Sequence, residues 1–92
     1  YCVVLYRFNP EAAYSDAQQE EIFSSHLRYI KKLFGENTVV MSGAYTEVNG
    51  GLVVLEVNSR EEAEDIAAAD PALSSSLYLG EVHEWRVLFE RR

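Results

Sequence analysis

The pattern of apolar and charged residues between Ser15 and Gly35 predicts one amphipathic helix. At about 100° per residue, the apolar positions gather on one side of this helix and the charged positions on the other. Ser15 and Gln18 have the spacing of an N-terminal capping box, and Gly35 stands where a glycine commonly follows a helix. His26 lies at the centre of the apolar side, which we expect to be buried. That side comprises Ile22, Phe23, Leu27, Tyr29, Ile30, Leu33 and Phe34.

The remaining apolar runs predict four strands, a second helix and a short helical turn. Asn49-Gly50 predicts a type I′ hairpin turn, which needs positive φ at both central residues. Gly43 predicts a bulge or a close backbone approach, and Ser59 with Glu62 predicts a second capping box. In chain order the predicted elements are strand 2–8, helix 15–35, strand 38–45, strand 52–57, helix 59–69, helical turn 72–77 and strand 81–89.

Asp70-Pro71 marks the end of the second helix, because the residue before a proline is disfavoured in the α conformation. Pro71 then suits the first position of the short helical turn. Asp70 stands directly before that turn, where an aspartate commonly caps a helix.

The element order β-α-β-β-α-β predicts a single-domain α+β protein with a ferredoxin-like fold. Two helices can cover only one face of a four-stranded sheet, yet the strands are apolar on both faces. In the first strand, Val3 and Leu5 point to one face. Val4, Tyr6 and Phe8 point to the other. Because strands of this kind are buried on both faces, we predict a homodimer in which two sheets pack together around a twofold axis.

Composition narrows the range of partners and compartments. The 92 residues carry a formal net charge of −7 without a cluster of Lys or Arg, so neither nucleic acid nor an anionic membrane is an expected partner. No apolar run approaches the roughly 20 residues of a membrane-spanning helix, and no secretory signal pattern is present. Cys2 is the only cysteine, which excludes an internal disulfide and a thiolate zinc cluster and fits a reducing cytoplasm.

Five segments in order carry a resemblance to a known family. They are H-L-R-Y-I-K-K-L at 26–33, V-V-M-S-G at 39–43, G-L-V-V-L-E-V at 51–57, S-R-E-E-A-E-D-I-A-A-A-D-P at 59–71 and E-W-R-V at 84–87. Together they resemble the YCII-related, or YciI-like, domain family over nearly the whole chain. The resemblance implies a ferredoxin-like fold that dimerises as an α+β barrel. It also implies a His–Asp pair that has been proposed as an active site, and the matching residues are His26 and Asp70.

The resemblance says less about the reaction. Most members of the family have no assigned reaction, a few relatives act on breakdown products of chlorinated aromatic compounds, and the fold is similar to that of muconolactone isomerases. This chain departs from the family at Ala72, where an aromatic residue is usual, and in the serine-rich segment 73–79. Both departures affect the expected wall of the pocket.

Paired with Asp70, His26 can act as a general acid or base. A carboxylate bonded to one imidazole nitrogen fixes the tautomer and leaves the other nitrogen free as a base near neutral pH. Such a group contributes roughly 10²–10⁴-fold in rate. A purely structural role is also consistent with the sequence: Asp70 caps the Pro71 turn and His26 bonds a backbone carbonyl. The two roles are compatible, because a carboxylate has several acceptor sites.

Four further residues are predicted to contact a substrate, namely Ser42, Gly43, Tyr6 and Trp85. Ser42 and Gly43 lie in a strand whose backbone is expected to be open to a ligand. Tyr6 and Trp85, together with other tyrosines, suit a pocket that holds a flat ring. Aromatic residues of a core or a subunit interface give the same pattern, and that role is the commoner one.

His83 shares a predicted strand face with Trp85, and we expect it at the rim of the sheet rather than in the site. His26, His83 and Asp70 form the one two-histidine, one-carboxylate set that the sequence offers, and the spacing does not favour a metal site. Neither a metal nor another cofactor is expected.

We therefore predict a small cytoplasmic enzyme in which His26 is the general acid or base and Asp70 orients it. The expected substrate is a small organic acid or lactone, and the expected reaction is of the isomerase, lyase or dehalogenase type. The alternative is a non-catalytic module on the same dimeric scaffold that binds a small ligand or another subunit. That alternative predicts a fully enclosed His26. A haem-binding member of the dimeric-barrel group is a third hypothesis, although 92 residues leave little room for a macrocycle.

Overall fold

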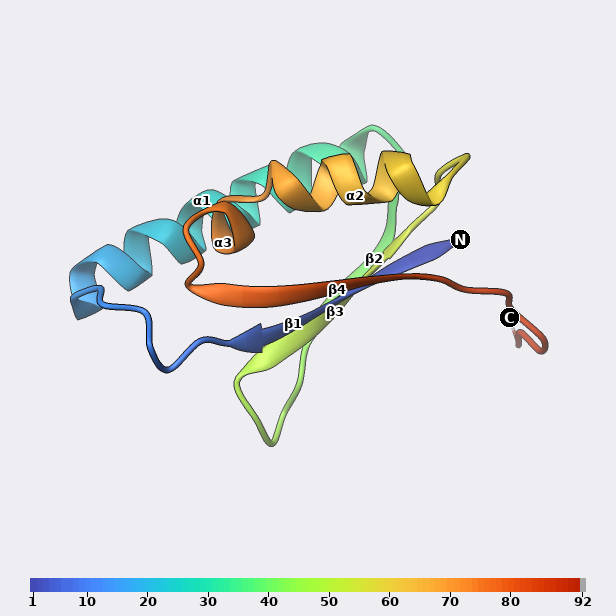
Figure 1. Ribbon diagram of the computed structural model, residues 1–92. Coiled ribbons are helices and arrows are strands. Elements are labelled where there is room, and N and C mark those ends of the chain that lie inside the picture. The colour runs from blue at the N-terminus through green and yellow to red at the C-terminus, as the bar shows by residue number, and fades with distance from the viewer. Residues whose placement is uncertain (92) are drawn as a thin grey trace.

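The computed structural model describes residues 1–91, which form four strands and three helices in the order β1 (Cys2–Phe8), α1 (Asp16–Gly35), β2 (Val39–Ala44), β3 (Gly50–Leu55), α2 (Arg60–Ala68), α3 (Pro71–Ser74) and β4 (Tyr78–Glu84). The strands make one antiparallel sheet in the order β2-β3-β1-β4, and the helices cover one face of it (Figure 1). This arrangement confirms the predicted α+β, ferredoxin-like fold. None of the helices in residues 1–91 combines the length and the apolar character that crossing a membrane requires.

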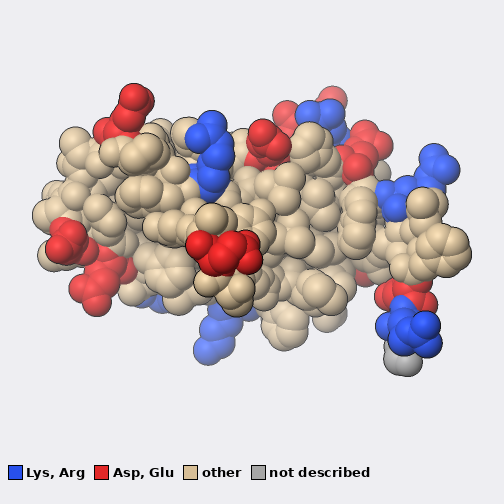
Figure 2. All heavy atoms as spheres, turned by 90° about the horizontal axis from the view of Figure 1, so that it is seen from below, with Lys and Arg blue, Asp and Glu red and all other residues tan. Residues whose placement is uncertain are grey.

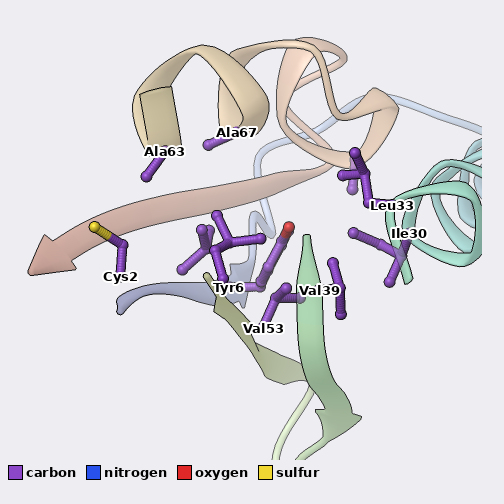
Figure 3. Packing of buried hydrophobic residues seen from close by; sticks show 11 residues of the cluster. Cys2, Tyr6, Ile30, Leu33, Val39, Val53, Ala63 and Ala67 are labelled. Carbon is purple, nitrogen blue, oxygen red and sulfur yellow. The ribbon is translucent and has the colours of Figure 1, made fainter. Parts of the chain in front are cut away.

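The core lies between the sheet and the helices (Figure 3). β1 contributes every second residue to it, as the two-residue period of a strand requires. α2 comes close to the sheet because its buried side chains are the small alanines Ala63 and Ala67. The buried cluster comprises Cys2, Val4, Tyr6, Ile30, Leu33, Val39, Val53, Leu55, Ala63, Ala67 and Ala72.

α1 buries less of its apolar side than predicted. Ile30 and Leu33 are buried, whereas Phe23, Leu27 and Phe34 are 44%, 52% and 59% exposed. The N-terminal part of α1 extends past the sheet (Figure 1), which leaves that part of the helix uncovered. Leu27 and Phe34 lie farther along the helix and are exposed there too. The expectation of a fully buried apolar side was therefore wrong.

The helix N-termini largely follow the predictions. Ser15 and Gln18 form the complete capping box, with both reciprocal hydrogen bonds present. Ser59 accepts a hydrogen bond from the backbone N–H of Glu62, but the return bond of the second box is not formed. Asp70 caps α3, and Pro71 is its first residue.

α1 ends with a different capping residue from the one predicted. Gly35 is still helical, and the residue in the left-handed region is Asn37, with φ of 62°. The N–H groups of Asn37 and Thr38 donate to the carbonyls of Phe34 and Leu33, which is the Schellman pattern. Asparagine can take this place because it tolerates the left-handed conformation better than other residues with a side chain.

β2 and β3 pair antiparallel as predicted, but the turn that joins them is not of the predicted type. No glycine in residues 1–91 has positive φ, so the predicted type I′ turn at Asn49-Gly50 is wrong. The loop is longer, and the N–H of Tyr45 closes it by donating to the carbonyl of Gly50 at 2.9 Å. The bulge in β2 lies at Val40, near the start of the strand, rather than at Gly43.

β4 (Tyr78–Glu84) begins and ends earlier than the predicted strand 81–89. All of its residues pair with β1. The next residue, Trp85, lies outside the strand, although its N–H still donates to the carbonyl of Tyr1. The predicted bounds were wrong because the start of β4 depends on its pairing with Phe8 as well as on its own residues.

Candidate active site

His26 and Asp70 lie side by side where α1 meets α3. Nδ1 of His26 is 2.8 Å from Oδ1 of Asp70 and 2.9 Å from Oδ2. The Asp70 side chain is 1% exposed and the His26 side chain 12%. The proline after Asp70 ends α2 and starts α3, which contacts α1, so the local break in the chain places the carboxylate beside His26. The partner of the ring is thus an acidic side chain rather than a backbone carbonyl.

Asp70 accepts hydrogen bonds from three donors on three elements. Besides His26, they are the backbone N–H of Ala72, 2.9 Å from Oδ1, and the Tyr6 hydroxyl, 2.6 Å from Oδ2. These hydrogen bonds replace those that the carboxyl group would make to water if it were exposed. Because a carboxylate only accepts, Nδ1 of His26 must carry a proton, and in the neutral ring Nε2 then has the lone pair. The capping role and the pairing role of Asp70 therefore coexist.

Tyr6 reaches Asp70 from β1, on the opposite side of the core. Figure 3 shows its hydroxyl pointing from the sheet towards the helices. Burial, the charge of Asp70 and the hydrogen bond to Asp70, in that order, raise the pKa of Tyr6 well above its usual value. The phenol therefore stays protonated and remains a donor. Its ring also packs edge-on against the His26 ring, with centroids 5.3 Å apart.

A cavity of about 310 Å³ opens beside His26. Nε2 of His26 makes no hydrogen bond within residues 1–91, and every enclosed polar side-chain atom there has a partner, so Nε2 is accessible to solvent. The volume lies at the lower end of the roughly 300–1,000 Å³ range of ligand pockets. The lining consists of Tyr6, Phe23, His26, Leu27, residues 42–45, residues 48–53, Ala72 and Tyr78.

The structure brings three of the four predicted substrate contacts to this cavity. Tyr6, Ser42 and Gly43 line it. Gly43 has open space where a Cβ would be, so the close backbone approach predicted for it is wrong. Trp85 does not line the cavity, and its ring lies 6.4 Å from that of Tyr1 at the far end of β1.

His83 lies outside the site, as expected. Its side chain is 55% exposed and contacts Glu81 at 3.3 Å. It pairs with Val3, on the face of the sheet opposite the helices. Within residues 1–91, no three His, Cys, Asp or Glu side chains come together in a group that can hold a metal ion.

Apart from His26, Ser42, Gly43 and the tyrosines Tyr6, Tyr45 and Tyr78, the residues of the cavity wall were not predicted from the sequence. Phe23 and Leu27 were assigned to the buried side of α1 and instead line the cavity. Phe23 precedes His26 by three residues, a spacing that makes the two neighbours on the helix surface and could have identified it. Tyr78 and Asn49 close the wall farther along the chain, where the Tyr78 hydroxyl donates to Oδ1 of Asn49 at 2.6 Å. No local pattern relates those two positions.

Comparison with known proteins places the chain among its relatives. Residues 1–86 match the YCII-related domain family. Uncharacterized protein YjpA of Bacillus subtilis strain 168 is 31% identical over 68 residues, which cover 74% of this chain and 80% of YjpA. The structure of 5-chloro-2-hydroxyhydroquinone dehydrochlorinase (TftG) from Burkholderia phenoliruptrix AC1100, in complex with 2,5-dihydroxybenzoquinone, has the same fold, with a TM-score of 0.70, 18% identity and 94% of each chain covered. By its sequence match over nearly its whole length, the chain belongs to the YCII-related domain family.

Proposed function

We propose that this protein is a small cytoplasmic enzyme in which His26 transfers a proton to or from a small ring-derived molecule. One observation carries the proposal: Nδ1 of His26 is held 2.8 Å from the buried Asp70 while the rest of the ring lines an open cavity. The expected substrates are small organic acids or lactones. Because the structure is similar to that of TftG, a dehydrochlorinase, we also expect hydroxylated ring compounds. The reaction is an isomerisation, an elimination or a dehalogenation.

The chemistry follows from the tautomer. Nε2 takes a proton from a C–H or O–H bond of the substrate, and the electron pair of that bond stays on the substrate. The imidazolium that forms keeps its hydrogen bond to Asp70, whose negative charge stabilises it. The electron pair then shifts a double bond or expels a leaving group such as chloride. Returning the proton to another atom completes an isomerisation.

The non-catalytic alternative is less consistent with the geometry. It predicts a fully enclosed His26, whereas the side chain is 12% exposed and lines the cavity.

The test compares two histidines of this chain. His26→Ala removes the proposed base, and His83→Ala removes an exposed histidine on the other face of the sheet. Because we also propose that face as a dimer interface, sedimentation first checks that the His83 variant keeps the oligomeric state of wild type. Wild type and both variants are incubated in deuterated buffer with chlorinated hydroquinones and with unsaturated lactones, and NMR follows deuterium uptake while an electrode follows chloride release. We expect the His26 variant to lose roughly 10²–10⁴-fold in rate and the His83 variant to match wild type. Equal rates in all three proteins, or no turnover by wild type, would favour the non-catalytic alternative.

We also propose a homodimer formed through the sheet face opposite the helices. On that face Val3, Leu5 and Leu52 are partly exposed, whereas Val54 is already buried. Glu81 and His83 of β4 lie beside them at the edge of the sheet. Figure 2 shows this side of the molecule, where uncharged residues predominate. A second copy related by a twofold axis would remove this apolar surface from water.

Sedimentation velocity of matched leucine variants tests the dimer. Leu5→Glu places a charge in the middle of the proposed interface and should give a monomer at micromolar concentration. Leu88→Glu makes the same change at a side chain that is 75% exposed beyond the sheet, and it should remain a dimer. A monomeric wild-type protein contradicts the proposal.

A further inference from the structure

The cavity beside His26 has no fixed charge on its walls. Within residues 1–91, the lining contains no Lys, Arg, Asp or Glu side chain. Proteins that bind a carboxylate in a pocket commonly supply an arginine, a lysine or a set of backbone N–H donors, because an unpaired carboxylate is expensive to remove from water. Among the described residues of the lining, His26 is therefore the only side chain that can carry a positive charge.

The charge closest to the cavity has the wrong sign for an anion. Asp70 lies directly behind His26, with its carboxyl group 2.8 Å from Nδ1. The chain as a whole carries a formal charge of −7, which repels anions at longer range. A carboxylate at Nε2 would also face the lone pair that this tautomer presents. It could bind only if His26 took up a proton, and a protonated His26 is no longer a base.

The walls suit an uncharged ring. Ser42, Tyr45 and Asn49 contribute neutral hydrogen-bonding groups, while Phe23 and Tyr78 contribute aromatic surface. The volume of about 310 Å³ matches a compound of one ring. These features favour hydroxyl and carbonyl substituents over ionised ones.

We propose that the cavity selects uncharged, planar, one-ring compounds that carry an acidic proton and rejects their carboxylate analogues. The inference rests on the proposed function and narrows it: of the organic acids and lactones expected from the sequence, lactones and ring hydroxy compounds fit, and carboxylates do not. The proton passes from the neutral substrate to Nε2 of His26. The negative charge then appears on the substrate only when the imidazolium is present to balance it.

A matched pair of ligands tests the selection. 3,4-Dihydroxybenzamide and 3,4-dihydroxybenzoate share the ring and its hydroxyls and differ in charge at neutral pH. Titration of each into the wild-type protein is followed by calorimetry and by the NMR signals of the His26 ring. We expect the amide to bind at least tenfold more tightly and to shift those signals.

Two serine variants distinguish the effect of a charge in the cavity wall from the effect of the net charge of the protein. Ser42→Lys adds a cation to the cavity wall and should reverse the preference in favour of the benzoate. Ser24→Lys adds the same charge at an exposed position of α1 outside the lining, and it should leave the preference as in wild type. Benzoate binding as tight as amide binding in wild type overturns the inference and leaves the role of His26 standing. If neither ligand shifts the His26 signals, the proposed small-molecule site is wrong as well.

Discussion

Tyr6 donates a 2.6 Å hydrogen bond to Asp70, so the carboxyl group that holds His26 is itself held from the sheet. The three side chains come from β1, α1 and the cap of α3, and they meet only in the folded chain. Tyr6 does not reach Nε2 of His26 through this bond, and its hydroxyl acts on the ring only through Asp70. We therefore regard Tyr6 as a positioning residue.

Replacing Tyr6 with phenylalanine should destabilise the fold more than the same change at Tyr29. The Tyr6 hydroxyl bonds a buried carboxyl group, whereas the Tyr29 hydroxyl bonds the backbone carbonyl of Ile66 at 2.8 Å. Hydrogen bonds to charged groups contribute about 1.5–3 kcal/mol and those to neutral groups about 0.5–1.5 kcal/mol. Urea denaturation at pH 7 gives the free energies of unfolding. A smaller loss for Tyr6→Phe than for Tyr29→Phe would mean that the bond to Asp70 is not specially strong.

Tyr6 should also make the protein sensitive to alkali. Its pKa is raised in the folded state, whereas an unfolded tyrosine loses its proton near pH 10. Above that pH the unfolded chain gives up a proton that the folded chain keeps, so stability is complete below pH 10 and falls as the pH rises. One such group lowers the free energy of unfolding by about 1.4 kcal/mol between pH 9 and pH 11.

The variant Tyr6→Phe isolates this contribution. Its stability should fall less than that of wild type over the same pH range, as measured by urea denaturation at pH 9 and pH 11. Part of the fall should remain, because burial also raises the pKa values of Tyr29 and Tyr78. Identical losses in the two proteins would show that Tyr6 does not retain its proton.

The sequence predicted the elements whose signals are local. Periodicity identified α1, and the Asp-Pro step identified the break at Asp70 that positions the carboxyl group. Features that depend on a distant partner were not predictable in this way: the start of β4 is set by where β1 ends, and the burial of Phe23 depends on how far α1 extends past the sheet.

The same distinction applies to the site. The pairing of His26 with Asp70 came from a family resemblance rather than from spacing, because no local rule relates positions in two different helices. The alternation of β1 placed Tyr6 on the covered face, yet only the assembled fold shows that its hydroxyl reaches Asp70. The pattern of residues within one element predicts the face on which a side chain lies. It does not predict a contact with another element, because that depends on how the two elements pack.

Replacing Asp70 with asparagine should reverse the tautomer of His26. The N–H of Ala72 bonds Oδ1 of Asp70, so it will hold the amide oxygen in that place and put the amide NH₂ in the place of Oδ2, beside Nδ1 and the Tyr6 hydroxyl. The amide NH₂ then donates to both, so the hydroxyl turns from donor to acceptor and Nδ1 accepts, with the ring proton on Nε2. Asparagine is as good a helix cap as aspartate, so α3 should persist.

Long-range ¹H–¹⁵N NMR of the His26 ring distinguishes the two tautomers at a pH where the ring is neutral. Wild type should show the proton on Nδ1 and the variant should show it on Nε2. The variant should also lose general-base activity, with a rate roughly 10²–10⁴-fold lower. A proton that remains on Nδ1 in the variant would mean that Asp70 does not determine the tautomer.

Two glycines of the cavity wall should respond oppositely to alanine. A Cβ at Gly50 would overlap the backbone carbonyl oxygen of Tyr6, whereas a Cβ at Gly43 meets nothing within 4 Å. Gly50→Ala should therefore lower the free energy of unfolding by about 1–3 kcal/mol, as overpacking does, because rigid backbone must move. Gly43→Ala should change it by less than about 0.5 kcal/mol and only add a methyl group at the cavity. Urea denaturation of both variants decides the matter: equal stabilities would show that β1 and β3 can separate there without loss, and that Tyr6 is held less firmly than its bond to Asp70 implies.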